Sequence, residues 1–162
     1  MPPTSPLSRI AMALLVLVAV AATAVALSNH RQLAQQRATV DIDLRRETAG
    51  VRLWGMSYPE SFGRWSEGPT VEIVFIRPLS GAYTLYLTAL AEHNNVGKPV
   101  SLTWGEHKTA VSLTSAMATY KLSLPPADAR ALRIAVPDPR KTGGDGRYIG
   151  VALSRVTLVP EQ

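Results

Sequence analysis

The sequence contains no cysteine, which excludes disulfide bonds, thiol nucleophiles and thiolate metal ligands. Histidine is also scarce, since only His30, His93 and His107 occur among the 162 residues. Their wide spacing matches no metal-binding motif, and we expect neither a cofactor nor a metal. No serine stands in a Gly-x-Ser-x-Gly elbow, so the sequence gives no sign of a serine hydrolase.

Charged residues make up 18% of the chain, and the formal net charge of +5 is scattered without a polybasic tract. A nucleic-acid partner is therefore not expected. Helical periodicity is missing too, because no stretch after Arg46 repeats its apolar residues every 3.6 positions.

The sequence does contain one long uncharged run of eighteen residues, Ile10 to Leu27, after a short tail of residues 1–9. At about 1.5 Å per residue, a helix of this length spans roughly 27 Å, close to the hydrocarbon thickness of a bilayer. We therefore predict a transmembrane helix over residues 10–27 that anchors the chain in the lipid bilayer. Ala24-Val25-Ala26 matches the small-x-small pattern of signal peptidase sites, so a cleaved signal segment is the alternative.

After a juxtamembrane linker of residues 28–39, residues 40–160 alternate apolar and polar side chains in short runs between turn residues. This pattern predicts an all-β domain, an antiparallel β-sandwich of jelly-roll or immunoglobulin-like type. Gly105-Glu106 fits a two-residue hairpin turn. The expected strands cover residues 40–44, 51–54, 71–77, 82–90, 100–104, 110–113, 119–124, 132–136 and 149–158.

The alternation also predicts which side chains face the core, and these include Leu85, Leu87, Ile134 and Val151. Prolines stand at the ends of the runs, where a missing backbone donor is tolerated. Pro78 therefore marks an expected boundary between two strands, as do Pro125 and Pro126.

The irregular segment of residues 55–68 concentrates aromatic and charged side chains, among them Glu60, Arg64, Trp65 and Glu67. Aromatic rings stack on the C–H faces of sugars, while arginine and glutamate hydrogen-bond to hydroxyl groups. We therefore interpret this segment as a candidate saccharide site. The structural alternative is that Trp65 plugs one end of the sandwich while Arg64 and Glu60 form a buried ion pair.

Two further connections carry polar residues. Residues 92–99 include Asn95 and Gly97, which permit positive φ, so a turn already explains this segment. Residues 137–148 form an expected long, flexible loop whose glycines lack the spacing of a phosphate-binding loop. A calcium site is an alternative use of this loop, with Asp145 joined by Asp41 or Asp43.

Three segments resemble a bacterial β-sandwich domain of uncharacterised function. They are residues 60–68 with Gly-Arg-Trp-Ser, residues 95–99, and residues 146–153 with Arg-x-x-Gly-x-x-Leu. That domain stands at the C-terminus of membrane-embedded phosphoglycerol transferases of the periplasmic-glucan type and of some membrane glycosyltransferases. The similarity covers about residues 40–159, and the large catalytic portion of those enzymes has no counterpart in this sequence. Together with the loop composition, the resemblance gives the candidate ligand-binding residues Glu60, Arg64, Trp65, Glu67, Asn95 and Arg147.

We predict a non-catalytic, membrane-anchored module that binds a periplasmic glycan or docks to a glycosyltransferase or phosphoglycerol transferase. A structural subunit of a membrane protein complex is the alternative, and a small glycoside hydrolase using Glu60 or Glu67 is a third reading. Arg9 faces four downstream arginines across the span, which by the positive-inside count favours a cytoplasmic domain. The resemblance implies the opposite, a single-pass protein of the bacterial inner membrane with its β-domain in the periplasm.

Overall fold

The computed structural model describes residues 37–144 and 146–161. The predicted transmembrane helix over residues 10–27 lies outside these residues, and so does Asp145, the candidate calcium ligand. Within the described part of the chain, no helix has the length and hydropathy that crossing a membrane requires. The predicted β-domain of residues 40–160 lies almost entirely within the described part.

The described residues are all-β and their strands pair antiparallel, which confirms the predicted fold class at this level. Each strand alternates its side chains between two faces, so one face can be buried while the other meets water. A single 3₁₀ turn, η1 (His93–Asn95), is the helical content of this part. The strands are β1 (Val40–Asp43), β2 (Val51–Trp54), β3 (Arg64–Trp65), β4 (Thr70–Ala91), β5 (Pro99–Trp104), β6 (His107–Ser112), β7 (Ala118–Ala135), β8 (Arg140–Lys141), β9 (Tyr148–Ile149) and β10 (Val151–Pro160).

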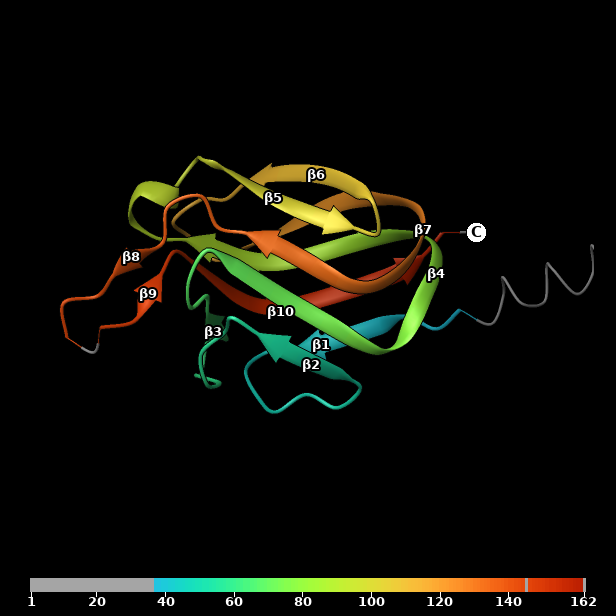
Figure 1. The fold of residues 1–162 in the computed structure, drawn as a ribbon, viewed down its shortest axis with the longest axis horizontal. Helices are drawn as coiled ribbons and strands as arrows, with labels where there is room; N and C mark the ends of the chain where they lie inside the picture. Colours follow the sequence, from blue (N-terminus) through green and yellow to red (C-terminus); the bar gives the residue numbers. More distant parts are fainter. Residues whose placement is uncertain (1–36, 145, 162) are drawn as a thin grey trace, which may run out of the picture. The chain divides into compact units, whose positions relative to one another are not determined.

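β4 and β7 are long, bent strands that each run through both layers of a β-sandwich (Figure 1). The first layer contains, in order, β2, the first half of β4, the second half of β7, β5 and β6. The second layer contains β1, β10, the second half of β4 and the first half of β7. The two layers are therefore continuous through the same pair of strands.

The corners between the layers explain why four expected strands are really two. Residues 75–78 of β4 stand opposite Arg130 alone, and residues 125–126 of β7 stand opposite Ala82, so the ladder shifts register at both places. We expected strands to end at Pro78 and at the two prolines of β7. Instead the chain bends there and continues, because a proline costs little where the ladder is already interrupted.

Inward-facing side chains of both layers form one hydrophobic core. Trp104 lies between the layers, with its ring edge-on to Phe75 at 6.0 Å and to Tyr83 at 5.6 Å between centroids. Because Phe75 and Tyr83 belong to opposite halves of β4, these contacts join the two layers. The four side chains expected in the core are fully buried, namely Leu85, Leu87, Ile134 and Val151.

Two regions that we expected to be irregular contain short strands. Within residues 55–68, β3 pairs with β10 along the edge that β1 also uses. The expected flexible loop of residues 137–148 includes β8 and begins β9, and these two strands pair with each other. Strands of two residues are too short to show a period in the sequence, which is why the pattern missed them.

Candidate functional site

The three segments that carry the family resemblance meet at Gly150. The Ser66 Oγ atom accepts hydrogen bonds from the backbone amides of Gly150 and of the next residue, both at 3.1 Å. The amide of Glu92, which precedes η1, donates to the Gly150 carbonyl at 2.9 Å. A Cβ atom at position 150 would lie 2.4 Å from Val136, closer than real contacts allow, and 3.0 Å from the Asn95 side chain, which is a tight contact. This close approach requires glycine, and it makes the three segments one structural unit.

Arg64 is buried, and its guanidinium is satisfied within the protein. It donates to three backbone carbonyls at 3.0 to 3.3 Å, one at Ser57 and two in the connection that follows β1. Its carboxylate partner is Glu47, at 3.3 Å, so the expected pair with Glu60 does not form. A buried guanidinium held by carbonyl groups is a structural element, because removing it would leave those acceptors unpaired.

Asn95 is fully buried at the end of η1 and connects this turn to the segment after β7. Its Nδ2 atom donates to the Asp138 carbonyl at 2.8 Å, and its Oδ1 atom accepts from the Asp138 amide at 2.8 Å. Nδ2 also donates to the Glu92 carbonyl at 3.2 Å. Since both polar atoms of the amide are bonded within the protein, the geometry favours a structural use of this side chain.

Trp65 is half-buried on β3 and lies opposite Ala152 of β10. Phe62 contacts its ring edge-on at 5.4 Å between centroids, and the Trp65 amide donates to the Ser57 Oγ atom at 3.0 Å. The ring is therefore neither a fully buried plug nor a free platform. One part packs on the protein, and the other part remains accessible.

Glu60 and Arg147 are partly exposed and form an ion pair at 3.6 Å. This contact brings the segment of residues 55–68 to the residues before β10, as the loops at one end of a sandwich are expected to gather. Glu67 is exposed, and its amide donates to the Gly55 carbonyl at 2.7 Å. With Trp65, four of the candidate ligand-binding residues thus keep surface that a ligand can reach.

Two exposed tyrosines lie in, or next to, segments that hydrogen-bond to residues 65–68. Tyr58 is 88% exposed and Tyr148 is 52% exposed. The Tyr148 carbonyl accepts from the Gly68 amide at 2.9 Å, and Ser57, beside Tyr58, donates its amide to a carbonyl of β3. Our sequence reasoning did not select these two tyrosines. The only sign of them in the sequence was an aromatic residue within a mostly polar connecting segment. The accessible region, termed the loop end, consists of Tyr58, Glu60, Trp65, Glu67, Arg147 and Tyr148.

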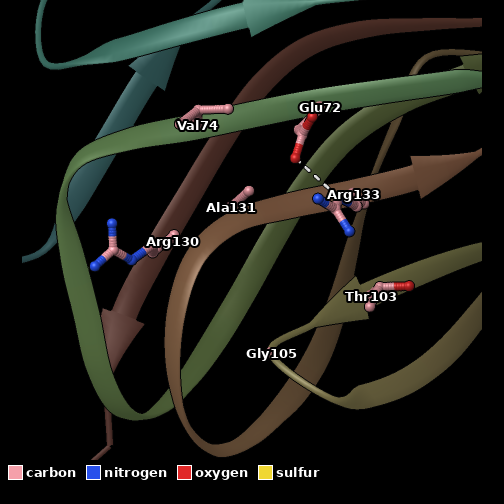
Figure 2. Close-up of a pocket in the computed structure, with 7 residues that line it drawn as sticks. All are labelled: Glu72, Val74, Thr103, Gly105, Arg130, Ala131 and Arg133. Atoms are coloured by element: carbon pink, nitrogen blue, oxygen red, sulfur yellow. Dashed lines mark hydrogen bonds and ion pairs between the residues drawn. The ribbon is translucent and has the colours of Figure 1, made fainter.

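A separate hollow of about 210 Å³ lies on the outer face of the first layer (Figure 2). Val74 of β4 and Ala131 of β7 contribute apolar surface, and Thr103 of β5 contributes a hydroxyl group. An ion pair between Glu72 and Arg133, at 2.8 Å, joins the two central strands within the hollow. Sequence reasoning passed over these residues because they occupy ordinary outward positions of alternating strands.

Three carboxylates have pKa values lowered by their neighbours. The hydrogen bond from Arg155 lowers the pKa of Asp41, and a hydrogen bond from an arginine likewise lowers the pKa of Asp43. The Asn94 side chain is the main cause of the lowered pKa of Asp138. These carboxylates are held in the charged form, whereas a general acid needs a raised pKa. Among the described residues, no group of three or more acidic or histidine side chains is placed to hold a metal.

A family model described as "Domain of unknown function (DUF7024)" matches residues 28–160. Phosphoglycerol transferase I of Escherichia coli O6:K15:H31 (strain 536) is 32% identical over 118 residues, which cover 67% of this chain. The match spans only 16% of that relative's length.

Two solved structures are similar to this chain at low sequence identity. One is described as BiXyn10A CBM1 in the apo form, with a TM-score of 0.49 at 12% identity over 75% of this chain and 97% of that chain. The other is a family two carbohydrate esterase from Cellvibrio japonicus, with a TM-score of 0.46 at 14% identity over 77% of this chain and 34% of that chain.

Proposed function

The chain belongs to the DUF7024 family, and we propose that it is a non-catalytic module that binds saccharide at the loop end. The observation that carries this proposal is the exposure of Tyr58, two residues before Glu60, and of Tyr148, next to Arg147, where Glu60 and Arg147 form an ion pair. The core does not use these rings. Exposed aromatic side chains beside polar ones are typical of a binding site.

The chemistry of the loop end suits a sugar. A tyrosine offers a flat apolar face for the C–H groups of a pyranose, together with a hydroxyl group that donates and accepts. The Glu60 carboxylate accepts hydrogen bonds and the Arg147 guanidinium donates them, so both kinds of partner for sugar hydroxyls are present. By contrast, Arg64 and Asn95 are committed to backbone groups, and we assign them to the scaffold.

The module would act beside a larger enzyme of glycan metabolism. Supporting this, the relative named phosphoglycerol transferase I contains the matching region as 16% of its length, so the module accompanies much additional protein there. The chain would be anchored in the bacterial inner membrane by residues 10–27 and hold its β-domain in the periplasm. A glycosyltransferase or phosphoglycerol transferase is the partner of this proposal.

The proposal is tested by calorimetric titration of the full chain, in detergent, with a linear glucan oligosaccharide. The double variant Tyr58→Ala, Tyr148→Ala should weaken binding strongly with little change in Tm, because neither ring is buried. The control Tyr86→Ala removes a tyrosine of the second layer, remote in the sheet from the loop end, and should bind like the wild type. Unchanged binding by the double variant would contradict the assignment to the loop end.

Trp65→Ala separates the ligand contribution from the structural one. Because the ring is half-buried against Phe62, we expect this variant to lose about 2 kcal/mol of unfolding free energy as well as affinity. The competing function is that of a purely structural subunit. The observation that favours it is that the matching region makes up only 16% of the relative's length. A structural subunit predicts no glucan binding by the wild type, together with co-purification of a membrane transferase. Glucan hydrolysis that Glu60→Gln abolishes would instead establish the hydrolase.

A further inference from the structure

A row of cross-strand neighbours crosses the outer face of the first layer, away from the loop end. In the register of the sheet, Trp54 of β2 lies opposite Glu72 of β4, Glu72 opposite Arg133 of β7, and Arg133 opposite Thr103 of β5. Directly opposed residues of antiparallel strands project on the same face. With strands about 4.8 Å apart, the row from Trp54 to Thr103 extends about 14 Å. The row is long enough for a short oligosaccharide.

The middle of this row is the hollow of about 210 Å³ (Figure 2). Its polar lining is held in place, because Glu72 accepts a hydrogen bond from the Arg133 Nε atom at 2.8 Å. Val74 and Ala131 add apolar surface beside this pair. The hollow is open on the side toward β6, because Gly105 forms the hairpin turn there, with φ of +57° and no side chain to project from it.

The charge of this face is positive and partly uncompensated. Arg130 and Arg133 lie on either side of Ala131 along β7, and both line the hollow (Figure 2). The glutamate of the hollow is already paired with Arg133, whereas the Arg130 guanidinium makes no hydrogen bond or ion pair with the described residues. Arg52 of β2, exposed and opposite Val74, is likewise without a described partner. Such guanidinium groups favour a phosphate or carboxylate, which they bind in a bidentate manner.

Trp54 supplies the aromatic end of the row. It is 61% exposed, although tryptophan is the residue with the largest apolar surface to bury. Its position beside a cationic hollow combines a stacking surface for a sugar ring with donors for an anion.

We propose that the face formed by Trp54, Glu72, Arg130 and Arg133 binds a negatively charged saccharide, a sugar chain that carries a phosphate ester or a carboxylate. This inference rests on the proposed saccharide function and adds a second site that selects for charge. Trp54 stacks on the sugar, Arg130 binds the anionic group, and Glu72 holds Arg133 in place within the hollow. Because the charges are exposed, the affinity should fall as the ionic strength rises.

The test is calorimetric titration of the full chain with three probes: a glucan oligosaccharide bearing a glycerol phosphate ester, its neutral parent, and free glycerol phosphate. The background is the Tyr58→Ala, Tyr148→Ala variant, so that the loop end does not contribute. We expect the charged oligosaccharide to bind at least about tenfold more tightly than either other probe, since a hydrogen bond to a charged group is worth about that factor.

Two variants separate the roles on this face. Arg130→Gln should reduce the affinity for the charged oligosaccharide by at least about tenfold and leave the neutral parent unaffected. Trp54→Ala should weaken both oligosaccharides. The controls are Lys121→Gln and Tyr86→Ala, a cation and an aromatic on the second layer with 6.0 Å between the ammonium and the ring centroid. Both controls should bind like the background variant.

The possible failures are distinguishable. Equal binding of the charged and neutral oligosaccharides would overturn the charge selectivity and leave the saccharide function in place. Free glycerol phosphate binding as tightly as the charged oligosaccharide would show a simple anion site and overturn the proposal. If the wild type binds the oligosaccharides but the background variant binds none of them, saccharide binding is confined to the loop end and the second site is overturned. Failure of every probe to bind the wild type would overturn both proposals.

Discussion

At the scale of single residues, the region around Gly150 depends on one hydroxyl group. The Ser66 Oγ atom accepts hydrogen bonds from two successive backbone amides, which lie more than eighty positions after Ser66 in the chain. Ser66 is fully buried, so water is not at hand to replace it. A hydroxyl oxygen has two lone pairs, and here both are used.

Ser66→Ala should therefore lower the unfolding free energy by about 2 kcal/mol or more, because two buried donors lose their acceptor. Chemical denaturation of the wild type and the variant measures this difference. Ser61→Ala is the matched control, since Ser61 is exposed on the same segment and should change stability by less than about 0.5 kcal/mol. A variant at position 66 as stable as the control would show that the two amides find other partners.

At the scale of strands, the phase of the alternation decides which substitutions matter. Leu87 of β4 is fully buried in the core, and its side chain projects on the face opposite to that of its neighbours along the strand. Leu87→Ala should cost about 2 to 5 kcal/mol through lost burial and the cavity left behind. Thr84→Val, on the outward face of the same strand, should cost less than about 1 kcal/mol. Similar losses in thermal or urea unfolding would show that the assigned strand phase is wrong.

β1 should be the strand most sensitive to acid. Arg155 of β10 donates to the Asp41 carboxylate at 2.7 Å, and this bond lowers the pKa of Asp41 in the folded state. A carboxyl group with a lowered folded pKa stabilises the protein above its unfolded pKa of about 3.9, and this contribution is lost as the pH falls further. The pair is exposed to solvent, so its contribution is less than about 1 kcal/mol.

Asp41→Asn should accordingly be less stable than the wild type at pH 7, and this difference in Tm should shrink as the pH falls below about 4. Glu106→Gln in the β5–β6 turn is the control, because Glu106 makes no ion pair with the described residues. A difference between Asp41→Asn and the wild type that stays constant from pH 7 to pH 3 would contradict the electrostatic explanation.

At the scale of the whole molecule, the sequence predicted the class of fold better than the connections within it. The period of two identified the buried face of β4 and β10, since that period follows directly from strand geometry. The period did not show that β4 continues through Pro78. A proline marks a place where the hydrogen-bond ladder is interrupted, and the ladder is interrupted both at a strand end and at a corner within a strand. A local pattern does not distinguish these two cases.

The candidate site shows the same limit. The motif segments converge in the structure, but the carboxylate partner of Arg64 is Glu47 and not Glu60, which is closer to Arg64 in the sequence. Pairing across distant segments depends on the completed fold, which the spacing of residues does not encode. Trp54 and Arg130 could not be distinguished from other outward residues until the fold placed Trp54 opposite Glu72 and Arg130 at the hollow that Glu72 also lines.

The orientation of the module in a membrane is a prediction at this scale. A reporter that is active only in the periplasm, fused after Gln162, should be active, because the family resemblance implies a periplasmic domain. The same fusion with a reporter active only in the cytoplasm is the control and should be silent. Activity of the cytoplasmic reporter alone would support the count of arginines on either side of residues 10–27.

The sharing of β4 and β7 by both layers has a consequence for the way the module opens. Neither layer can separate without breaking hydrogen bonds of strands that also belong to the other layer. Partial opening is thus limited to peripheral strands such as β1, β2 and β6, which pair along one edge only. The amide protons of β4 and β7 that lie in the ladder should exchange with solvent only when the whole module unfolds, as one cooperative unit. A module built this way keeps the loop end and the hollow of the first layer in a fixed relation whenever it is folded.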